Sequence, residues 1–486
     1  MDIHSFNDTI CAPATGSGGA IALIRISGPA CFSAVDSVVR FRKGTAASAP
    51  ASRIKFGEIP EVDEVLVSLF RAPHSYTGED SAEISCHASP FIVSRILQLL
   101  TDAGCRPAGP GEFTRRAFLN GKMDLAQAEA VADVIAADTE AAHRIATNQL
   151  RGQYSLRLRT LRDRLLEIAS LMELELDFSE EEVEFADRAK LRALLAETCA
   201  EISRLADSFR TGNAIKNGVP VVIAGAANAG KSTLLNALLG EERAIVSDIP
   251  GTTRDTVEET LVLGDVRFRF IDTAGLRESS DAIERIGIER SYASMAKAQV
   301  VIGVLDGLSP LDELRKACEE ITKRLSPAQT LLMVRNKVDA YDAIPPEEFP
   351  RFDRVYGILE LKYPAFGTYN WPPDQLAGEL GIPSLLDISA RSGEGLESLK
   401  QRLLESVGDL GSPDNATLVT NLRHYEALHS ALEDLGRVSA GLDSGLTGDL
   451  LAQDLRSATR SLGSIFGEIT TDDILGRIFE RFCIGK

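Results

Sequence analysis

The chain contains 486 residues, of which 44% are hydrophobic and 25% charged, and this composition predicts two to four globular domains. The formal net charge of −19 argues against a broad, non-specific nucleic-acid surface, although not against a local patch. No apolar run approaches the roughly 18 residues of a membrane span, and the N-terminus lacks the features of a secretion signal. The seven cysteines are scattered without a C-x-x-C pair, so neither a disulfide framework nor a zinc site is expected, and the expected compartment is a reducing cytoplasm.

The first half of the chain divides into two blocks of different pattern. Residues 1–120 mix short apolar runs, such as Val65–Phe70, with glycine-rich turns, which predicts an α+β domain. Residues 121–215 contain long stretches almost without glycine or proline, and their apolar residues recur at intervals of three to four, as in amphipathic helices. We expect the last helix of this block to stop at Thr211–Asn213.

A basic cluster lies within the helical block, and two interpretations of it are open. It could form a local nucleic-acid patch, or it could be the solvated face of a helix, which is the more common outcome for a charge run. The cluster comprises Arg151, Arg157, Arg159, Arg162 and Arg164.

A complete phosphate loop of the form G-x-x-x-x-G-K-S occupies residues 225–232. It follows a strand-like apolar run at 219–224 and precedes a helical run at 233–239, which is the context that phosphate binding requires. The backbone N–H groups of such a loop, together with the helix N-terminus, surround a polyphosphate. Lys231 is predicted to reach the β- and γ-phosphates, and the Ser232 hydroxyl is predicted to bind Mg²⁺.

Further motifs follow in the order typical of a GTPase. Threonines within 250–255 are predicted to form a mobile switch, and Asp272–Gly275 to supply a Mg²⁺-side aspartate and a glycine that senses the γ-phosphate. Asp339, in the motif Asn336-Lys337-Val338-Asp339, can accept two N–H bonds from guanine, and an acceptor left unpaired rejects adenine by roughly 10⁴-fold. Ser389-Ala390-Arg391 follows another apolar run and completes a guanine-binding loop. With alternating strands and helices, these motifs predict a parallel α/β GTPase domain at 216–407.

The residue after the Asp-x-x-Gly motif is Leu276, which cannot orient a water molecule as the usual glutamine does. The nearest polar candidates for that role are Arg277 and Glu278. No internal arginine finger is evident, although Arg254 stays open for the role. Because such a finger contributes roughly 10³ to 10⁵ in rate, this GTPase is expected to need another cation or a partner.

The pattern turns helical again after the GTPase motifs and stays helical over residues 408–486. Helical blocks therefore flank the α/β domain on both sides, which predicts a GTPase domain inserted into a helical domain. The expected fold is multidomain. It comprises an α+β N-terminal domain at 1–120, a discontinuous helical domain at 121–215 and 408–486, and an inserted P-loop α/β GTPase domain at 216–407.

Essentially the whole chain resembles the tRNA modification GTPase family MnmE, also called TrmE. Outside the GTPase motifs, the resemblance depends on segments that reveal no function by physical reasoning alone. These segments are Ile24–Gly28, Tyr76–Asp80, Pro110–Lys122, Asp124–Ala130 and the terminal Cys483–Lys486.

The resemblance implies a homodimer whose N-terminal domains pair and bind a reduced folate, either 5-formyl- or 5,10-methylene-tetrahydrofolate. The implied folate contacts are Arg25, Glu83, Lys122 and Lys486. Cations suit the glutamate tail of a folate, and a carboxylate suits the N–H edge of its pterin. For Cys483, a nucleophilic thiolate and a structural thiol near this pocket are both open, and the structural role is favoured.

The resemblance also implies how hydrolysis proceeds without an arginine finger. A K⁺ ion bound between two G domains would take its place, Glu278 would orient the water, and Lys231 would be the second catalytic residue. The implied metal ligands are Asn228, Ser247, Ile249 and Thr252 for K⁺, and Ser232 and Thr253 for Mg²⁺. The implied GTP contacts are Asn228, Ala229, Gly230, Lys231, Ser232, Thr233, Ser247, Asp248, Ile249, Pro250, Gly251, Thr252, Thr253, Asp272, Thr273, Ala274, Gly275, Asn336, Lys337, Asp339, Ser389, Ala390 and Arg391.

In function, the resemblance implies a cytoplasmic GTP-hydrolysing enzyme that acts on certain tRNAs in a heterotetramer with an FAD-dependent MnmG-type (GidA) partner. The pair would add an aminomethyl or carboxymethylaminomethyl group at C5 of wobble uridine 34, using the folate as one-carbon donor. Two alternatives are open: a signalling or ribosome-assembly GTPase whose flanking domains only bind partners, and a free-standing folate enzyme with a regulatory G domain. The segment 340–383 is longer than the family pattern predicts. It could be a surface insertion or a partner contact, and the insertion is favoured.

Overall fold

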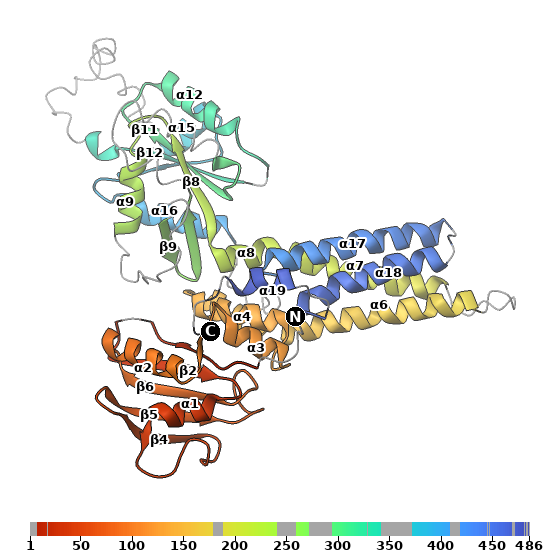
Figure 1. The fold of residues 1–486 in the computed structure, drawn as a ribbon. Coiled ribbons are helices and arrows are strands. Elements are labelled where there is room, and N and C mark those ends of the chain that lie inside the picture. Colours follow the sequence, from red (N-terminus) through yellow and green to blue (C-terminus); the bar gives the residue numbers. More distant parts are fainter. Residues whose placement is uncertain are drawn as a thin grey trace, which may run out of the picture. The chain divides into compact units, whose positions relative to one another are not determined.

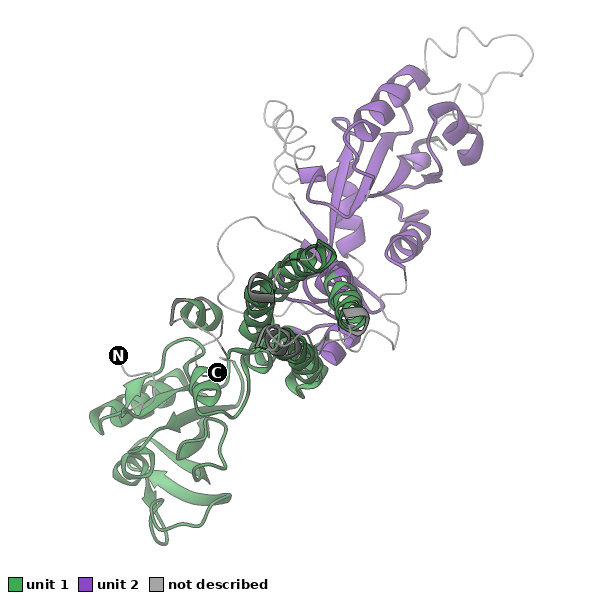
Figure 2. Cartoon of the chain, turned by 90° about the vertical axis from the view of Figure 1, so that its right-hand side faces the viewer, with its two compact units in different colours: residues 1–136, 146–206, 423–486 green, residues 137–145, 207–422 purple. Residues whose placement is uncertain are grey.

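A computed structural model describes residues 7–16, 18–177, 188–240, 259–271, 294–327, 329–341, 372–408, 418–444, 446, 448–468, 472–480, 482 and 485. The chain forms two compact units (Figure 2). Unit 1 comprises residues 1–136, 146–206 and 423–486, and unit 2 comprises residues 137–145 and 207–422. Because most of unit 2 is one stretch between two parts of unit 1, the predicted multidomain fold with an inserted α/β domain is confirmed. The domain boundaries at 120, 215 and 407 stay predictions.

The N-terminal part of unit 1 is a seven-stranded sheet in the order β3-β4-β5-β6-β2-β1-β7. Neighbouring strands are antiparallel except β1 and β7, which are parallel. Helices α1 (Cys31–Val38) and α2 (Pro90–Asp102) pack on this sheet (Figure 1). The strands are β1 (Ile10–Pro13), β2 (Ile21–Ser27), β3 (Arg40–Phe41), β4 (Arg53–Ile59), β5 (Asp63–Phe70), β6 (Ser81–His87) and β7 (Arg106–Pro107).

Alternation along the strands explains why the two faces of this sheet differ. On β5, the side chains of Val65, Val67 and Leu69 are buried in one core with α1 and α2. Leu66, which lies between them, is 48% exposed. Successive side chains of a strand point to opposite faces, so the other face of the sheet is open at this strand.

The rest of unit 1 is helical, and α6 packs along α18. On α6, buried residues recur at the three-to-four spacing of an amphipathic helix, at Leu158, Leu161, Leu165 and Ile168. Among the helices that the structure describes, none is long and apolar enough to cross a membrane. The helices are α3 (Glu112–Leu119), α4 (Leu125–Ala136), α5 (Glu140–Leu150, whose first residues belong to unit 2), α6 (Gln153–Asp177), α7 (Arg188–Asp207), α17 (Leu422–Asp443), α18 (Gly448–Phe466) and α19 (Asp472–Phe479).

The basic cluster of the helical block is largely neutralised. Four of its five arginines form ion pairs with carboxylates of unit 1, and this pairing favours the structural interpretation over a nucleic-acid patch. The pairs are Arg157–Glu201, Arg164–Glu201, Arg159–Asp124 and Arg162–Glu468.

The helix stop expected at Thr211–Asn213 is wrong. Helix α7 ends at Asp207, and α8 (Phe209–Asn217) runs straight through Gly212. A Cβ atom on Gly212 would overlap the carbonyl oxygen of Val419. The glycine therefore serves close packing of α8 against the chain at Val419, not the termination of a helix.

Unit 2 contains a six-stranded sheet in the order β13-β12-β11-β8-β10-β9. All neighbours are parallel except the antiparallel pair of β9 and β10. The strands are β8 (Val219–Gly225), β9 (Glu259–Leu263), β10 (Val266–Phe270), β11 (Val300–Asp306), β12 (Thr330–Asn336) and β13 (Leu385–Asp387). The helical elements are α8, α9 (Lys231–Gly240), α12 (Leu311–Thr322), the 3₁₀ helix η2 (Val338–Tyr341), α15 (Pro373–Leu380) and α16 (Leu396–Ser406).

Both faces of this sheet are covered, which explains the near-continuous apolar character of its central strands. On β8, Val221 and Ile223 belong to the core that includes α9 and α16. Val222 and Ala224 point the other way, into the core that includes α12 and α15. The chain leaves β8 toward β10 on one side and returns to β11 on the other, and open α/β sheets bind ligands at such a switch point, beyond the carboxyl ends of the strands.

Candidate functional site

The P loop connects the carboxyl end of β8 to α9, where the sequence placed it. Gly230 has φ +93°, and a Cβ atom there would overlap the side-chain nitrogen of Asn336. Asn228, at the exposed turn of the loop, has φ +60°, and Ala229 is buried behind it. Two residues of the loop thus have left-handed backbone conformations, which are typical of anion-binding nests.

Lys231 is the first residue of α9 and is only 8% exposed. Its Nζ donates hydrogen bonds to the carbonyl oxygens of Gly225 (3.1 Å) and Ala226 (2.7 Å), so the ammonium group lies over the loop itself. Ser232 is half-buried beside it, and Thr233 is exposed. This is the position from which a P-loop lysine contacts phosphate oxygens.

Asn336, at the end of β12, joins two of the predicted motifs. Its Nδ2 donates to the carbonyl oxygen of Ala229 in the P loop (2.9 Å), and its Oδ1 accepts from the backbone N–H of Ala390 (2.9 Å). The side chain is buried, with both ends of its amide satisfied. Asn336, which the sequence predicted as a nucleotide contact, therefore connects the phosphate loop to the guanine-binding loop.

The guanine-binding residues meet beside this bridge. Asp339 lies in η2, and its Oδ1 accepts a hydrogen bond from the Ser389 hydroxyl (2.7 Å). Lys337 has φ +70°, and its Nζ pairs with Asp306 at the end of β11 (2.7 Å). Arg391 is exposed at the rim of the same loop. The structure thus brings together the ends of β8, β11, β12 and β13 at one edge of the sheet.

A buried ion pair that the sequence analysis missed joins β12 to β13 next to this edge. Arg335 is 2% exposed, and its guanidinium binds Asp387 through two bonds, Nε to Oδ1 (2.6 Å) and Nη2 to Oδ2 (2.5 Å). The two residues are register partners on β12 and β13. The available signal was an arginine within an apolar strand, since buried charges require a partner.

Several predicted residues lie outside the described part of the chain, so their positions are not part of this geometry. They are the switch residues Ser247, Asp248, Ile249, Pro250, Gly251, Thr252 and Thr253, the motif Asp272, Thr273, Ala274 and Gly275, and Arg254, Leu276, Arg277, Glu278, Cys483 and Lys486.

In the N-terminal domain, Arg25 and Glu83 face each other across β2 and β6 as register partners. The Arg25 Nε donates to Glu83 Oε1 (3.0 Å), and its guanidinium carbon lies 5.2 Å and 5.7 Å from the ring centroids of Tyr76 and Phe113. Its Nη1 donates to the carbonyl oxygen of Gly485 (3.3 Å). Gly485 therefore lies at Arg25.

Lys122 lies beside the loop that carries Tyr76. Its Nζ donates to the carbonyl oxygen of Pro73 (2.9 Å), and its methylenes pass 3.3 Å from where a Cβ of Gly78 would be. Arg25 and Lys122 thus both border this loop, one at the Tyr76 ring and one at Pro73, and Glu83 is paired with Arg25.

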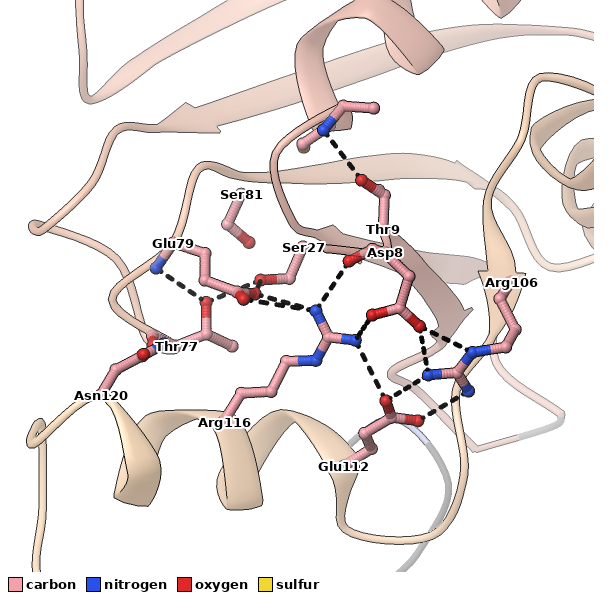
Figure 3. Close-up of polar contacts among 12 residues, drawn as sticks. Asp8, Thr9, Ser27, Thr77, Glu79, Ser81, Arg106, Glu112, Arg116 and Asn120 are labelled. Carbon is pink, nitrogen blue, oxygen red and sulfur yellow. Dashed lines mark hydrogen bonds and ion pairs between the residues drawn. The ribbon is translucent and has the colours of Figure 1, made fainter. Parts of the chain in front are cut away.

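A buried arginine explains two of the segments that carry the family resemblance (Figure 3). Arg116 is fully buried and donates to Asp8 Oδ1 (2.8 Å), to Glu112 (3.1 Å) and to Glu79 (3.3 Å). Burial would raise the pKa of Glu112, but the bonds from Arg106 and Arg116 hold it below its ordinary value. These residues lock the loop after β5 onto α3, so their role is structural.

Among the described residues, no disulfide joins the cysteines, and no group of three or more His, Cys, Asp or Glu side chains could hold a metal ion.

Comparison with known proteins identifies the chain's relatives. Residues 9–122 match the family described as "GTP-binding protein TrmE N-terminus", and residues 125–483 match the "MnmE helical domain" family. The tRNA modification GTPase MnmE of Bacteroides thetaiotaomicron is 47% identical over 99% of both chains. This chain belongs to the MnmE family. The MnmE homologue of Parabacteroides distasonis is 48% identical over 98% of this chain and 100% of its own length.

Membership confirms the predicted resemblance and, with the P loop, the prediction that this MnmE-family chain is a GTPase. A solved G domain of the Thermotoga maritima FeoB iron transporter is 23% identical, covers 40% of this chain and 99% of its own, and superposes with a TM-score of 0.24. A TM-score this low carries no argument, so the assignment of this chain as a GTPase depends on the sequence matches and on the geometry of the P loop and the guanine-binding residues.

Proposed function

We propose that this chain uses GTP hydrolysis to drive the modification of tRNA. The observation that carries the proposal is the meeting of Lys231, Asn336 and Asp339 at one sheet edge, in a chain 47% identical along its length to a tRNA modification GTPase. GTP would lie over this edge, with its phosphates in the P loop and its base beside Asp339. The predicted contacts at 247–253 and 272–275 belong to the same proposal.

The choice of guanine would come from Asp339. One of its carboxylate oxygens accepts the Ser389 hydroxyl, which fixes the orientation of the group. The carboxylate would then accept the two N–H groups of guanine's edge, and adenine would leave it unpaired.

The metal ions of the proposed reaction would be bound by hard oxygen ligands. Ser232, in the first turn of α9, offers a hydroxyl for Mg²⁺ beside Lys231, with Thr253 as the second ligand. Asn228 offers an amide oxygen for K⁺ at the exposed turn of the P loop, and Ser247, Ile249 and Thr252 would complete the site. Bound there, the cations would neutralise charge that develops on the phosphates, while Glu278 orients the water.

The proposed folate site is centred on Arg25. Its guanidinium, held by Glu83 between two aromatic rings, suits the carboxylates and the flat pterin of 5-formyl- or 5,10-methylene-tetrahydrofolate. Lys486 directly follows Gly485, whose carbonyl oxygen contacts Arg25, and this contact supports the inclusion of the C-terminal residue. Isothermal titration with 5-formyl-tetrahydrofolate should show binding that Arg25→Ala abolishes and that Arg95→Ala, an exposed arginine on α2, preserves.

We further propose that the chain is a cytoplasmic homodimer that acts with an FAD-dependent MnmG-type partner in a heterotetramer. Together they would add an aminomethyl or carboxymethylaminomethyl group at C5 of wobble uridine 34, with the folate as one-carbon donor. Family membership supports this part of the proposal.

The test is mass spectrometry of tRNA nucleosides from a strain that lacks this chain. The wild-type chain should restore the modified wobble uridine, Lys231→Ala should not, and Lys323→Ala, an exposed lysine of unit 2, should. An unchanged nucleoside profile in the deletion strain would favour the signalling or ribosome-assembly alternative. Restoration by Lys231→Ala would favour the folate enzyme with a regulatory G domain.

A further inference from the structure

The edge of the N-terminal sheet at β3 and β4 concentrates positive charge. Residues 40–55 contain no Asp or Glu, although the whole chain has a net charge of −19. We call the cationic side chains of this stretch the basic edge: Arg40, Arg42, Lys43, Arg53 and Lys55.

The basic edge presents its charge on both faces of the sheet. Phe41 is the register partner of Gly57, so it shares a face with Lys55, whose Nζ lies 4.4 Å from the Phe41 ring centroid. Phe56 points to the opposite face, where the Arg42 guanidinium lies 4.5 Å from its ring centroid. Each of these cations is thus held against an aromatic ring at the rim of the sheet.

The loop between β3 and β4 is fixed in place. The Asp36 carboxylate accepts the backbone N–H groups of Ala46 (2.5 Å) and Ala47 (3.0 Å). The Arg71 guanidinium donates to the carbonyl oxygens of Ala47 (2.6 Å) and Ala49 (3.2 Å). The Asp36 carboxylate is therefore used by the backbone. Glu58, the register partner of Arg40 on β4, is a second carboxylate at this edge, so the unopposed charge lies mainly on Arg42, Lys43 and Arg53.

The charge of the basic edge is available to a partner. None of its five side chains forms an ion pair with a residue in the described part of the chain, and four of the five are exposed. The basic cluster on α6 differs, since most of its arginines are paired with carboxylates. Both groups are cationic, but the cluster of the helical block is largely neutralised and the basic edge is not.

Charged residues also protect edge strands from pairing with another sheet. Edge protection does not account for Ile54 and Phe56, which are 68% and 37% exposed beside the cations. The proposed pairing of N-terminal domains is the alternative use of these two residues, and the sedimentation velocity in the test reports on it. Clustered cations with an exposed aromatic ring are instead the combination that binds nucleic acid, through phosphate contacts and base stacking.

We propose that the basic edge binds the sugar–phosphate backbone of RNA, with the Arg42 guanidinium, held over the Phe56 ring, as one of its phosphate contacts. The inference rests on the proposed function, which supplies a tRNA substrate, and it adds the surface on which that substrate is held. A polyanion is the partner that a narrow strip of five cations fits in an otherwise acidic protein.

The test compares tRNA binding by the full chain and by two triple variants that remove the same charge. One variant combines Arg42→Gln, Lys43→Gln and Arg53→Gln on the basic edge. The control combines Lys316→Gln, Lys323→Gln and Arg324→Gln, three exposed cations at α12 of unit 2. The affinity for a transcribed tRNA is measured by fluorescence anisotropy over a salt series, with the basal GTPase rate and sedimentation velocity recorded for each protein.

The edge variant should raise the Kd about tenfold near 0.1 M salt and lower the slope of log K against log salt by about 2, since each lost phosphate contact removes roughly 0.7–0.9. The control should bind as wild type, and all three should hydrolyse GTP equally. Equal binding by the edge variant and wild type, with or without new self-association, would overturn the proposal, as would equal losses in both variants. Failure of the wild type to bind tRNA at low salt would instead refute the tRNA substrate of the proposed function, and this inference with it.

Discussion

Substitution of Glu129 tests whether a buried charge cluster stabilises unit 1. Glu129, on α4, is 8% exposed and accepts two bonds from Arg423, at 3.0 Å and 3.1 Å. The Nε2 of His424 lies 2.7 Å from Glu129 Oε2, which also accepts from Arg423, and the Tyr154 ring stacks on His424 with centroids 5.5 Å apart. Arg423 also donates to carbonyl oxygens at the end of α18. The cluster thus joins helices from both halves of unit 1.

The expected magnitude follows from the pKa of the carboxyl group. Burial alone would raise the pKa of Glu129, but His424 and Arg423 lower it from 4.5 to about 2. That difference corresponds to about 3 kcal/mol of stabilisation at neutral pH, within the range of about 3–5 kcal/mol for removing one partner of a buried ion pair. Glu129→Gln should therefore lower the Tm of unit 1 by about 6–10 °C at pH 7.

The sign of the pH dependence is a second test. Because the folded-state pKa is depressed, the stabilisation is present above the unfolded pKa of about 4.5 and is lost as the pH falls toward 2. Wild type should therefore lose more stability than Glu129→Gln between pH 5 and pH 3.

Differential scanning calorimetry is the suitable assay, since it separates the transitions of a multidomain chain. Glu433→Gln provides a matched control on α17, because Glu433 is 64% exposed in its pair with His429 and should contribute less than about 1 kcal/mol. A Glu129→Gln Tm within about 1 °C of the control, or the same pH slope as wild type, would refute the reasoning.

Three further predictions concern the nucleotide site. Gly230→Ala should abolish GTP binding in a titration, because its φ of +93° is strained for alanine and the added Cβ would displace Asn336; wild-type affinity would contradict the assigned loop geometry. Asp339→Asn should weaken GTP binding and favour xanthosine triphosphate, because an amide can donate where the carboxylate only accepts, and unchanged GTP affinity would count against this role. Hydrolysis should be faster in KCl than in NaCl, and Asn228→Ala should remove the difference; equal wild-type rates in the two salts would defeat the cation proposal.

The sequence was sufficient for those parts of the site that local chemistry dictates. The P loop, the motif ending in Asp339 and the Ser389 loop each need a fixed residue type directly after a buried strand, so their spacing along the chain reveals their place at the sheet edge. The parallel sheet could also be predicted, because apolar strands that alternate with helices along the chain are typical of a parallel α/β sheet.

The missed features depend on residues that are distant in sequence. Arg335 pairs with Asp387 across 52 positions, and Arg423 pairs with Glu129 across 294. Which acid meets a buried arginine depends on strand order and helix packing, neither of which periodicity encodes. Gly212 is an error with the same cause. The sequence predicted a helix stop there, but the glycine allows α8 to pack closely against Val419, a residue far along the chain.

The same long-range packing gives a physical reason for family segments that appeared to carry no chemistry. Gly111 has φ +62°, and a Cβ there would crowd Phe479 and Phe482 near the C-terminus. Gly485 has φ +96°, and its Cβ would overlap the carbonyl oxygen of Pro13. Both glycines permit the end of the chain to pack on the N-terminal domain, where the Gly485 carbonyl reaches Arg25 across 460 positions. Gly485 is therefore packed into the N-terminal domain beside Arg25, and this position supports the proposal that the folate site includes the residue that follows it.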